Sequence, residues 1–158
     1  MRSPGTPIIT VIVVLSGAVL GRVVRVPPSP LLRVEGTDVA ISCNVSDYEG
    51  PREQNFEWRF SSGAGPAVNV LSTWDGSFTQ DSYLERVRSG GVRLERIGNS
   101  EVLLHVQDLR ASDGGNYTCI TPSTDATYRG NYEDQVQIKV IADPLRVAAP
   151  RGWLSLCA

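Results

Sequence analysis

The sequence predicts an all-β chain in which two antiparallel sheets pack as a sandwich, and three observations support this. Short runs of alternating apolar and polar residues recur between turn signals, as in half-buried strands. Cys43 and Cys119 are far apart in the chain, and Trp58 lies between them. Residues 113–119 read Asp-x-Gly-x-Tyr-x-Cys. A cysteine pair that links two sheets beside a buried tryptophan is typical of the immunoglobulin sandwich.

The stretch at residues 113–119 gives each of its key positions a mechanical role. Cys119 is expected to point into the core and form a disulfide with Cys43 on the other sheet. Tyr117, two residues earlier, is expected to form a tyrosine corner, in which its hydroxyl bonds to upstream backbone. Gly115 allows a tight turn because it has no Cβ. A disulfide that closes so long a loop is worth about 4 kcal/mol on the chain-entropy model, and it persists in an oxidising compartment.

Asp113 is placed to accept a charge-assisted hydrogen bond from an arginine at the base of the sandwich. Arg86 is the expected donor, because it lies where the strand before residues 102–106 is expected to begin. Arg88 and Arg93 are alternatives, since the residues after Ser89 blur the register.

Alternation and turn signals divide the chain into nine candidate strands, the number found in a V-type rather than a constant-type immunoglobulin domain. The expected domain covers residues 22–142. Its strands include the additional C′ and possibly C″ strands of the V type. They are expected at residues 22–26, 38–45, 56–60, 67–73, 83–88, 92–97, 102–106, 115–121 and 134–141.

The two ends of the chain do not fit the strand pattern. Residues 1–21 carry a positive charge at Arg2, an apolar run and small residues at the expected cleavage point, which predicts a signal peptide cut near Gly21 or Ala18. The apolar run is shorter than the ~20 residues of a spanning helix. Residues 143–158 read as a linker or the truncated start of a second domain, in which 145–147 could begin a strand. Cys157 is left as an odd cysteine.

Composition argues against several classes of function. The formal charge of −2 disfavours nucleic acid, which requires a basic face. Three cysteines and one histidine do not form a metal cluster, and no glycine motif predicts a phosphate or cofactor site. His105 falls on the solvent side of its expected strand, and the paired carboxylates lie in loops. We therefore expect no enzyme, no cofactor, no metal and no small-molecule substrate.

The remaining polar features favour binding to another protein. The sequons at Asn44 and Asn116 are expected to place N-glycans on the outer faces of the two sheets. The loops at residues 46–55 and 122–131 would then stay open at one end of the sandwich. They hold Tyr48, Arg52 and Tyr128, which are residue types that dominate binding energy at interfaces. Trp74 is a further candidate for an exposed aromatic contact.

Five stretches carry a resemblance to a known family, and generic variable domains do not share the last two of them. They are Arg22-Val23-Val24-Arg25-Val26-Pro27, Cys43-Asn44-Val45-Ser46-Asp47-Tyr48, Gln54-Asn55-Phe56-Glu57-Trp58, Thr121-Pro122-Ser123-Thr124-Asp125-Ala126-Thr127 and Gly130-Asn131-Tyr132-Glu133-Asp134. With them, residues 22–143 resemble the first immunoglobulin domain of the EWI family of surface proteins. The resemblance implies a surface glycoprotein with tandem immunoglobulin domains and one membrane helix, which associates with tetraspanins and modulates receptors or adhesion.

The sequence departs from that family in two respects, and these leave alternatives open. It holds one complete domain, and Glu57-Trp58 is followed by Arg59 where the family's name-giving tripeptide has isoleucine. The first alternative is a secreted, soluble single-domain decoy, in place of a module on the extracellular side of the plasma membrane. The second is an antigen-receptor-like variable domain, which is disfavoured because residues 130–134 lack the Gly-x-Gly bulge used for pairing.

Overall fold

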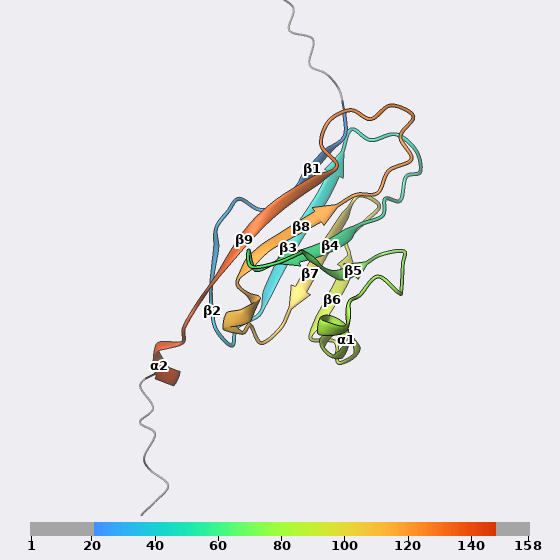
Figure 1. The fold of residues 1–158 in the computed structure, drawn as a ribbon. Helices are drawn as coiled ribbons and strands as arrows, with labels where there is room; N and C mark the ends of the chain where they lie inside the picture. The colour runs from blue at the N-terminus through green and yellow to red at the C-terminus, as the bar shows by residue number, and fades with distance from the viewer. Residues whose placement is uncertain (1–20, 148–158) are drawn as a thin grey trace, which may run out of the picture.

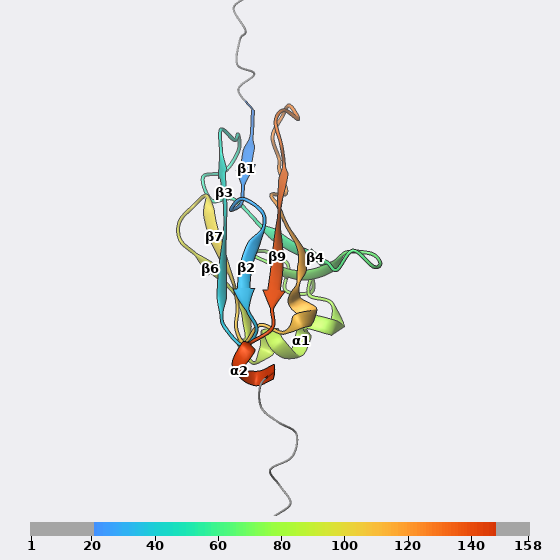
Figure 2. The same ribbon diagram turned by 90° about the vertical axis from the view of Figure 1, so that its left-hand side faces the viewer.

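The computed structural model describes residues 21–147, which form two stacked sheets (Figures 1 and 2). One sheet has the order β1-β3-β7-β6, and the other has the order β2-β9-β8-β4-β5. The predicted V-type sandwich is confirmed. The first sheet consists of β1 (Val23–Arg25), β3 (Val39–Ser46), β7 (Glu101–Val106) and β6 (Val92–Arg96). The second consists of β2 (Leu31–Val34), β9 (Glu133–Ile141), β8 (Gly115–Ile120), β4 (Glu57–Ser61) and β5 (Val68–Ser72).

The predicted strand at residues 22–26 is confirmed as β1, but the sequence analysis did not predict the short strand β2 that follows it in the other sheet. β1 pairs antiparallel with β3, and β2 then runs parallel to β9, which is the single exception to antiparallel pairing between the described strands. Pro27, Pro28 and Pro30 lie between the two segments. Proline has no amide hydrogen to continue a ladder, so the chain leaves the first sheet here and crosses to the second.

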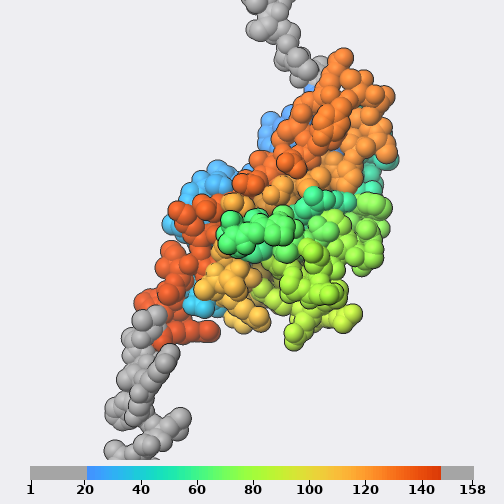
Figure 3. Space-filling view, viewed as in Figure 1, coloured from blue at the N-terminus to red at the C-terminus, as the bar shows by residue number. Residues whose placement is uncertain are grey.

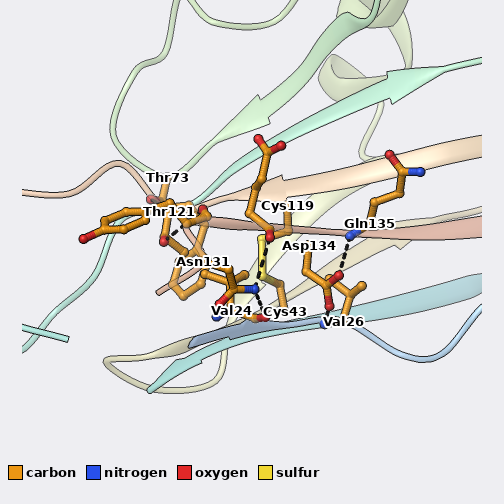
Figure 4. The surroundings of a disulfide bond; sticks show 12 residues. Val24, Val26, Cys43, Thr73, Cys119, Thr121, Asn131, Asp134 and Gln135 are labelled. Carbon is orange, nitrogen blue, oxygen red and sulfur yellow. Dashed lines mark hydrogen bonds between the residues drawn. A yellow bond between two sulfur atoms is a disulfide. The ribbon is translucent and has the colours of Figure 1, made fainter. Parts of the chain in front are cut away.

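The core lies between the sheets and follows the predicted alternation. Along β3, Val39, Ile41, Cys43 and Val45 are buried while Ala40 and Asn44 are exposed. Cys43 and Cys119 are joined by a disulfide between β3 and β8, with their Cα atoms 6.4 Å apart (Figure 4). Trp58 is fully buried and pairs in register with Cys119 on the neighbouring strand. The disulfide and the tryptophan therefore lie together at the centre of the sandwich.

The prediction of a strand at residues 83–88 is wrong, because α1 (Asp81–Arg88) is a helix. Tyr83, Glu85 and Val87 alternate in type, and this suggested a strand. In the structure Tyr83 is buried and Val87 is half-buried, while Glu85 between them is exposed. Positions four apart share one face of a helix. Asp81 in the first turn and Arg88 in the last complement the helix dipole.

No C″ strand is present within residues 21–147, and the edge of β5 is covered in another way. The side chain of Gln80 accepts a hydrogen bond from the Asn69 amide at 2.7 Å, and the Gln80 amide donates to the Asn69 carbonyl at 3.0 Å. The side chain and backbone of Gln80 thus form the hydrogen bonds with the Asn69 backbone that a further strand would have formed at this edge. The described residues 21–147 still form nine strands, because the unpredicted strand β2 takes the place of the strand wrongly predicted at residues 83–88.

The described chain begins and ends at opposite ends of the sandwich (Figure 1). Gly21 lies against Arg129 and Gly130 of the loop at residues 122–131. The last described element is α2 (Pro144–Val147) at the far end of the sandwich (Figure 1). The strand suggested at 145–147 is therefore wrong. Proline is favoured in the first turn of a helix, and the Asp143 carboxylate accepts a hydrogen bond from the Leu145 amide at 3.0 Å. The predicted signal peptide, except Gly21, and Cys157 lie outside the described residues.

Candidate recognition surface

Asp113 accepts the hydrogen bonds that hold the base of the sandwich together. Its carboxylate accepts hydrogen bonds from Arg86 at 2.6 Å and from the Arg110 amide at 2.8 Å, and its carbonyl accepts one from the Tyr117 hydroxyl at 2.9 Å. Arg86 reaches it from α1 rather than from a strand. Burial alone would lower the pKa of Arg86, but the hydrogen bond and the charge of Asp113 outweigh burial and raise it. Among the candidate donors, Arg93 pairs with Glu95 instead.

Gly115 occupies a position that a larger residue could not take. Its φ of +155° lies at the limit of the region that favours glycine, and a Cβ there would approach the Ser61 carbonyl oxygen to 2.5 Å and the Phe60 ring to 2.8 Å. The glycine allows β8 to begin directly against β4. This position serves the fold and is remote from the open loops.

The opposite end of the sandwich is organised around Arg22, whose role the sequence analysis did not identify. Its side chain is 1% exposed. The guanidinium donates to both carboxylate oxygens of Asp125, at 3.0 and 2.9 Å, and is the donor in three further hydrogen bonds. Its other acceptors are Gln54 at 2.9 Å, Thr121 at 3.0 Å and Ser123 at 2.9 Å. A buried guanidinium with a bidentate partner and this many acceptors is a strong, specific contact.

Arg22 is also in contact with aromatic rings. Its Cζ lies 5.1 Å from the centroid of the Tyr132 ring and 5.6 Å from that of Tyr48. Tyr128 stacks on Tyr132 with a centroid distance of 3.7 Å and an interplanar angle of 8°. A continuous set of contacts therefore runs from Tyr48 through Arg22 and Tyr132 to Tyr128. We call these four residues and Asp125 the Arg22 cluster.

The pKa of Asp125 is lowered to about 2, chiefly because its carboxylate accepts hydrogen bonds from Arg22. Hydrogen bonds from Ser123 and Tyr132 act in the same direction, and burial opposes them. The ionised carboxylate is thus the form that the cluster stabilises.

The loop at residues 122–131 is also joined to β1 by side chains (Figure 4). Asn131 acts as a substitute strand: its Oδ1 accepts from the Val24 amide at 2.8 Å, and its Nδ2 donates to the Val24 carbonyl at 2.9 Å. Asp134 accepts from the Val26 amide at 3.0 Å. The exposed edge of β1 is covered and the two sheets are held together at this end.

The predicted binding residues Tyr48, Arg52 and Tyr128 belong to the two loops at the end that holds the Arg22 cluster. Figure 3 shows the surface of the loop at residues 122–131 in orange at the top of the domain. Tyr128 is 78% exposed. Arg52 is exposed, and its carbonyl accepts a hydrogen bond from the Tyr48 hydroxyl at 2.9 Å. Tyr48 is half-buried against Arg22, so it supports this end of the domain as well as contributing to its surface.

The two sequons differ in exposure. Asn44 is exposed at the middle of its sheet, between Arg25 and Glu101 on the neighbouring strands. Asn116 is half-buried between Ser61 and Gln137. Both are on the sheets rather than in the loops of the Arg22 cluster. Occupancy of either site stays a prediction.

Chemistry-bearing groups elsewhere in the described chain are few. His105 Nε2 lies 2.6 Å from the Glu95 carboxylate on the outer face of the first sheet. Within residues 21–147 there is no group of three or more potential metal-ligating side chains. In the same range, no helix has the length and apolar character needed to cross a membrane.

Comparison with known proteins defines the class of this domain. Residues 26–141 match the family model for the immunoglobulin V-set domain, and the chain belongs to that family. It is 53% identical over 139 residues to the human prostaglandin F2 receptor negative regulator. It is 42% identical over 156 residues to mouse immunoglobulin superfamily member 8 and 43% identical over 126 residues to human immunoglobulin superfamily member 2. The predicted EWI-family resemblance is thereby confirmed.

The chain matches only a small part of these relatives. The match to the human negative regulator covers 86% of this chain and 16% of that protein, and the match to mouse member 8 covers 95% and 26%. The corresponding values for human member 2 are 78% and 12%. None of these names is that of an enzyme.

Solved structures show the same fold at low sequence identity. A chain from a study of T cell specificity and activation by the superantigen toxic shock syndrome toxin-1 superposes with a TM-score of 0.60 at 17% identity, covering 77% of this chain and all of that one. A chain of a chicken TCR crystal structure gives 0.53 at 15% identity, over 75% of this chain and 50% of that one.

Proposed function

We propose that this domain is a non-enzymatic extracellular recognition module that binds a protein partner with the end built by the Arg22 cluster. The exposed ring of Tyr128, stacked on Tyr132, is the observation that carries the proposal. Tyrosine supplies a large contact area at low entropic cost, and a ring already held by its neighbours loses little freedom on binding.

The arrangement of charges and hydrogen bonds supports a preformed surface. Arg22 is bound to residues from both loops: Gln54 from one, and Ser123 and Asp125 from the other. The two loops are therefore fixed relative to each other before a partner arrives. Interfaces with ordered loops bind with less reorganisation than flexible ones.

The two stretches that generic variable domains do not share, residues 121–127 and 130–134, both contribute to the Arg22 cluster. Asp125 lies in the first of them and Tyr132 in the second. Residues that serve the V-type frame, such as Trp58 and Tyr117, lie in the core instead. This separation supports a recognition role for the cluster that is specific to the family.

The wider setting of the proposal comes from the relatives. One of them is called a receptor negative regulator. We propose accordingly that the chain is the N-terminal domain of a surface glycoprotein that modulates receptors or adhesion and associates with tetraspanins. In this proposal residues 1–21 are a signal peptide and residues 143–158 lead towards a further domain.

Binding of the full secreted chain to cells that express candidate tetraspanins and receptors tests the proposal. Fluorescent tetramers of the wild type, Tyr128→Ala and Arg93→Ala are compared by flow cytometry. We expect Tyr128→Ala to weaken binding about tenfold, as for loss of one interface tyrosine. The control variant Arg93→Ala, whose residue lies on β6 away from the Arg22 cluster, should bind as the wild type does. Equal binding by all three proteins would contradict the proposal.

A further inference from the structure

The backbone at the start of the domain is fixed within the Arg22 cluster. The Arg22 amide donates a hydrogen bond to the Arg129 carbonyl at 3.1 Å, and the Arg22 carbonyl accepts one from the Asn131 amide at 2.9 Å. Gly130, with a φ of +88°, lies so close to the Arg22 carbonyl that a Cβ would not fit between them. The Arg22 backbone is therefore held in place at the position where the predicted signal peptide ends.

A small polar pocket, which we call the N-terminal pocket, lies beside this backbone. Its volume is about 120 Å³, and Gly21 contributes to its wall. The charged residues that line it are three acids and two arginines, namely Asp47, Glu49, Asp125, Arg22 and Arg129. Asp125 is already paired with Arg22 at 2.9 Å. The other three charges leave the pocket with one negative charge in excess.

Asp47 and Glu49 have accepting capacity that the described residues do not use. The Asp47 carboxylate accepts a hydrogen bond from the Ser46 hydroxyl at 3.2 Å, and the Glu49 carboxylate accepts one from the Ala126 amide at 3.3 Å. Neither carboxylate forms an ion pair with another residue in the range 21–147. Because an ionised carboxylate has several lone pairs, both can accept further hydrogen bonds, and a cation would balance the excess charge.

We propose that a cut after Gly21 leaves a free α-ammonium group on Arg22, and that this group binds Asp47 and Glu49 in the N-terminal pocket. Hydrolysis of the Gly21–Arg22 bond uses one water, whose hydroxyl forms the Gly21 carboxyl group. The remaining hydrogen of the water and the carboxyl proton both pass to the Arg22 nitrogen. An amide donates one hydrogen bond, whereas an ammonium donates three. One of them stays with the Arg129 carbonyl, and the other two go to the carboxylates.

The position of the cut therefore regulates the proposed recognition surface. This inference rests on the signal peptide of the proposed function, but it does not depend on partner binding. A cut after Ala18, the other predicted position, leaves Val19-Leu20-Gly21 in front of Arg22 and removes the ammonium from the Arg22 nitrogen by three residues. Asp47 and Glu49 then lack their cation. Leader removal after Gly21 is thus the step that completes the Arg22 cluster.

The chemical reactivity of the α-amine tests the proposal. Lys139 is the only lysine in the sequence, so its side-chain amine serves as the internal reference for the α-amine. Chains that begin at Arg22 and at Val19, each released from a fusion protein, are treated with a trace of acetic anhydride at about pH 8, near the ordinary α-amino pKa. Mass spectrometry measures acetylation of both amines in the folded and in the urea-denatured protein.

We expect folding to slow acetylation of the Arg22 α-amine about fivefold or more relative to Lys139, because an ammonium paired with carboxylates retains its proton. The Val19 α-amine should be slowed less than about twofold, since it has no such partners. Asp47→Asn combined with Glu49→Gln should remove the protection of Arg22. Glu53→Gln, in the same loop but outside the pocket lining, is the matched control and should retain it.

Two results would overturn the proposal. Equal protection of Arg22 in the double variant would show that burial alone shields the amine. Mass spectrometry of the secreted chain that finds a first residue other than Arg22 would show that the cut lies elsewhere. Thermal melts of each variant verify the fold. Because no readout uses a partner, failure of the proposed binding function would leave these results unchanged.

Discussion

Each end of this sandwich is held by an ion pair between an arginine and an aspartate, but the two pairs have different roles. Arg86 and Asp113 join helix α1 to the turn before β8, beside the tyrosine corner. Arg22 and Asp125 join the first residues of the domain to a loop that lies 103 positions further along the chain. The first pair serves any V-type domain. The second joins the start of the domain to the loop at residues 122–131, at the end of the proposed recognition surface.

The comparison indicates that the contribution of such an ion pair to stability depends on how deeply it is buried and on how many hydrogen-bond partners it has. The side chain of Arg22 is almost fully buried and has four side-chain acceptors, whereas that of Arg86 is partly exposed and has two acceptors. Removing one partner of a buried pair leaves an uncompensated charge, so the loss is larger where burial is more complete.

The largest expected effect follows from Arg22→Ala. This change leaves Asp125 buried without its partner, and we expect the free energy of unfolding to fall by about 3–5 kcal/mol. Chemical denaturation measures it. Arg22→Lys should recover little of the loss, because an ammonium cannot form the bidentate contact. Full recovery by lysine would show that charge alone, and not the geometry of the cluster, stabilises this end.

At the base, Arg86→Ala should cost less, about 2–3 kcal/mol, the range for a hydrogen bond to a charged group. We expect Arg88→Ala and Arg93→Ala to have effects within about 0.5 kcal/mol of zero. Melting temperatures of the three variants provide the measurement. Equal losses in all three would mean that Arg86 has no special role at the base.

The two ends should respond to opposite extremes of pH. The lowered pKa of Asp125 stabilises the folded state above the ordinary carboxyl pKa of 3.8, and this contribution is lost as the pH falls towards 2. Wild type and Asp125→Asn should therefore differ in melting temperature at neutral pH and converge between about pH 4 and 2. A constant difference across this range would contradict the assignment.

In alkali the base should weaken instead. Burial, together with the charge of Asp113, raises the pKa of Tyr83 to about 12, and burial also raises the pKa of Tyr117. The contribution of Tyr83 is complete below pH 10, the ordinary tyrosine value, and is lost as the pH rises towards 12. Between pH 10 and 12, the melting temperature of Tyr83→Phe should therefore fall less steeply with pH than that of the wild type.

Within the Arg22 cluster, the smallest expected effect on stability is that of Tyr128→Ala. Its ring makes one stacking contact and is otherwise exposed, so we expect a loss below about 1.5 kcal/mol. A melt of this variant beside Tyr48→Ala, whose ring supports Arg22, separates surface from support. A larger loss for Tyr128→Ala would make it a structural residue and weaken the proposed role in binding.

The parts of the molecule that could be predicted from the sequence are those with local signals. The period of two along Val39–Ser46 predicted a strand with one buried face. The motif at residues 113–119 predicted the ion pair between Asp113 and Arg86 at the base of the sandwich. In the structure the Arg86 guanidinium lies 2.6 Å from the Asp113 carboxylate. The period failed where two patterns coincide: Tyr83, Glu85 and Val87 fit a strand as well as a helix until burial distinguishes them.

The Arg22 cluster could not be predicted because nothing local signals it. Arg22 lies at the start of an ordinary alternating run, and Asp125 lies in a loop of polar residues. Their contact depends on a pairing between residues that are far apart in the sequence, in which Arg22 forms a β-bridge with Gly130.

The central claim is that the Arg22 cluster holds the loop at residues 122–131 in one conformation before any partner binds. Backbone order parameters of this loop, measured by nuclear magnetic resonance relaxation on the wild type and on Arg22→Gln, test it most directly. The account predicts values near 0.85, as for rigid backbone, in the wild type and below about 0.6 in the variant. Values below 0.6 in the wild type, or no change in the variant, would contradict it.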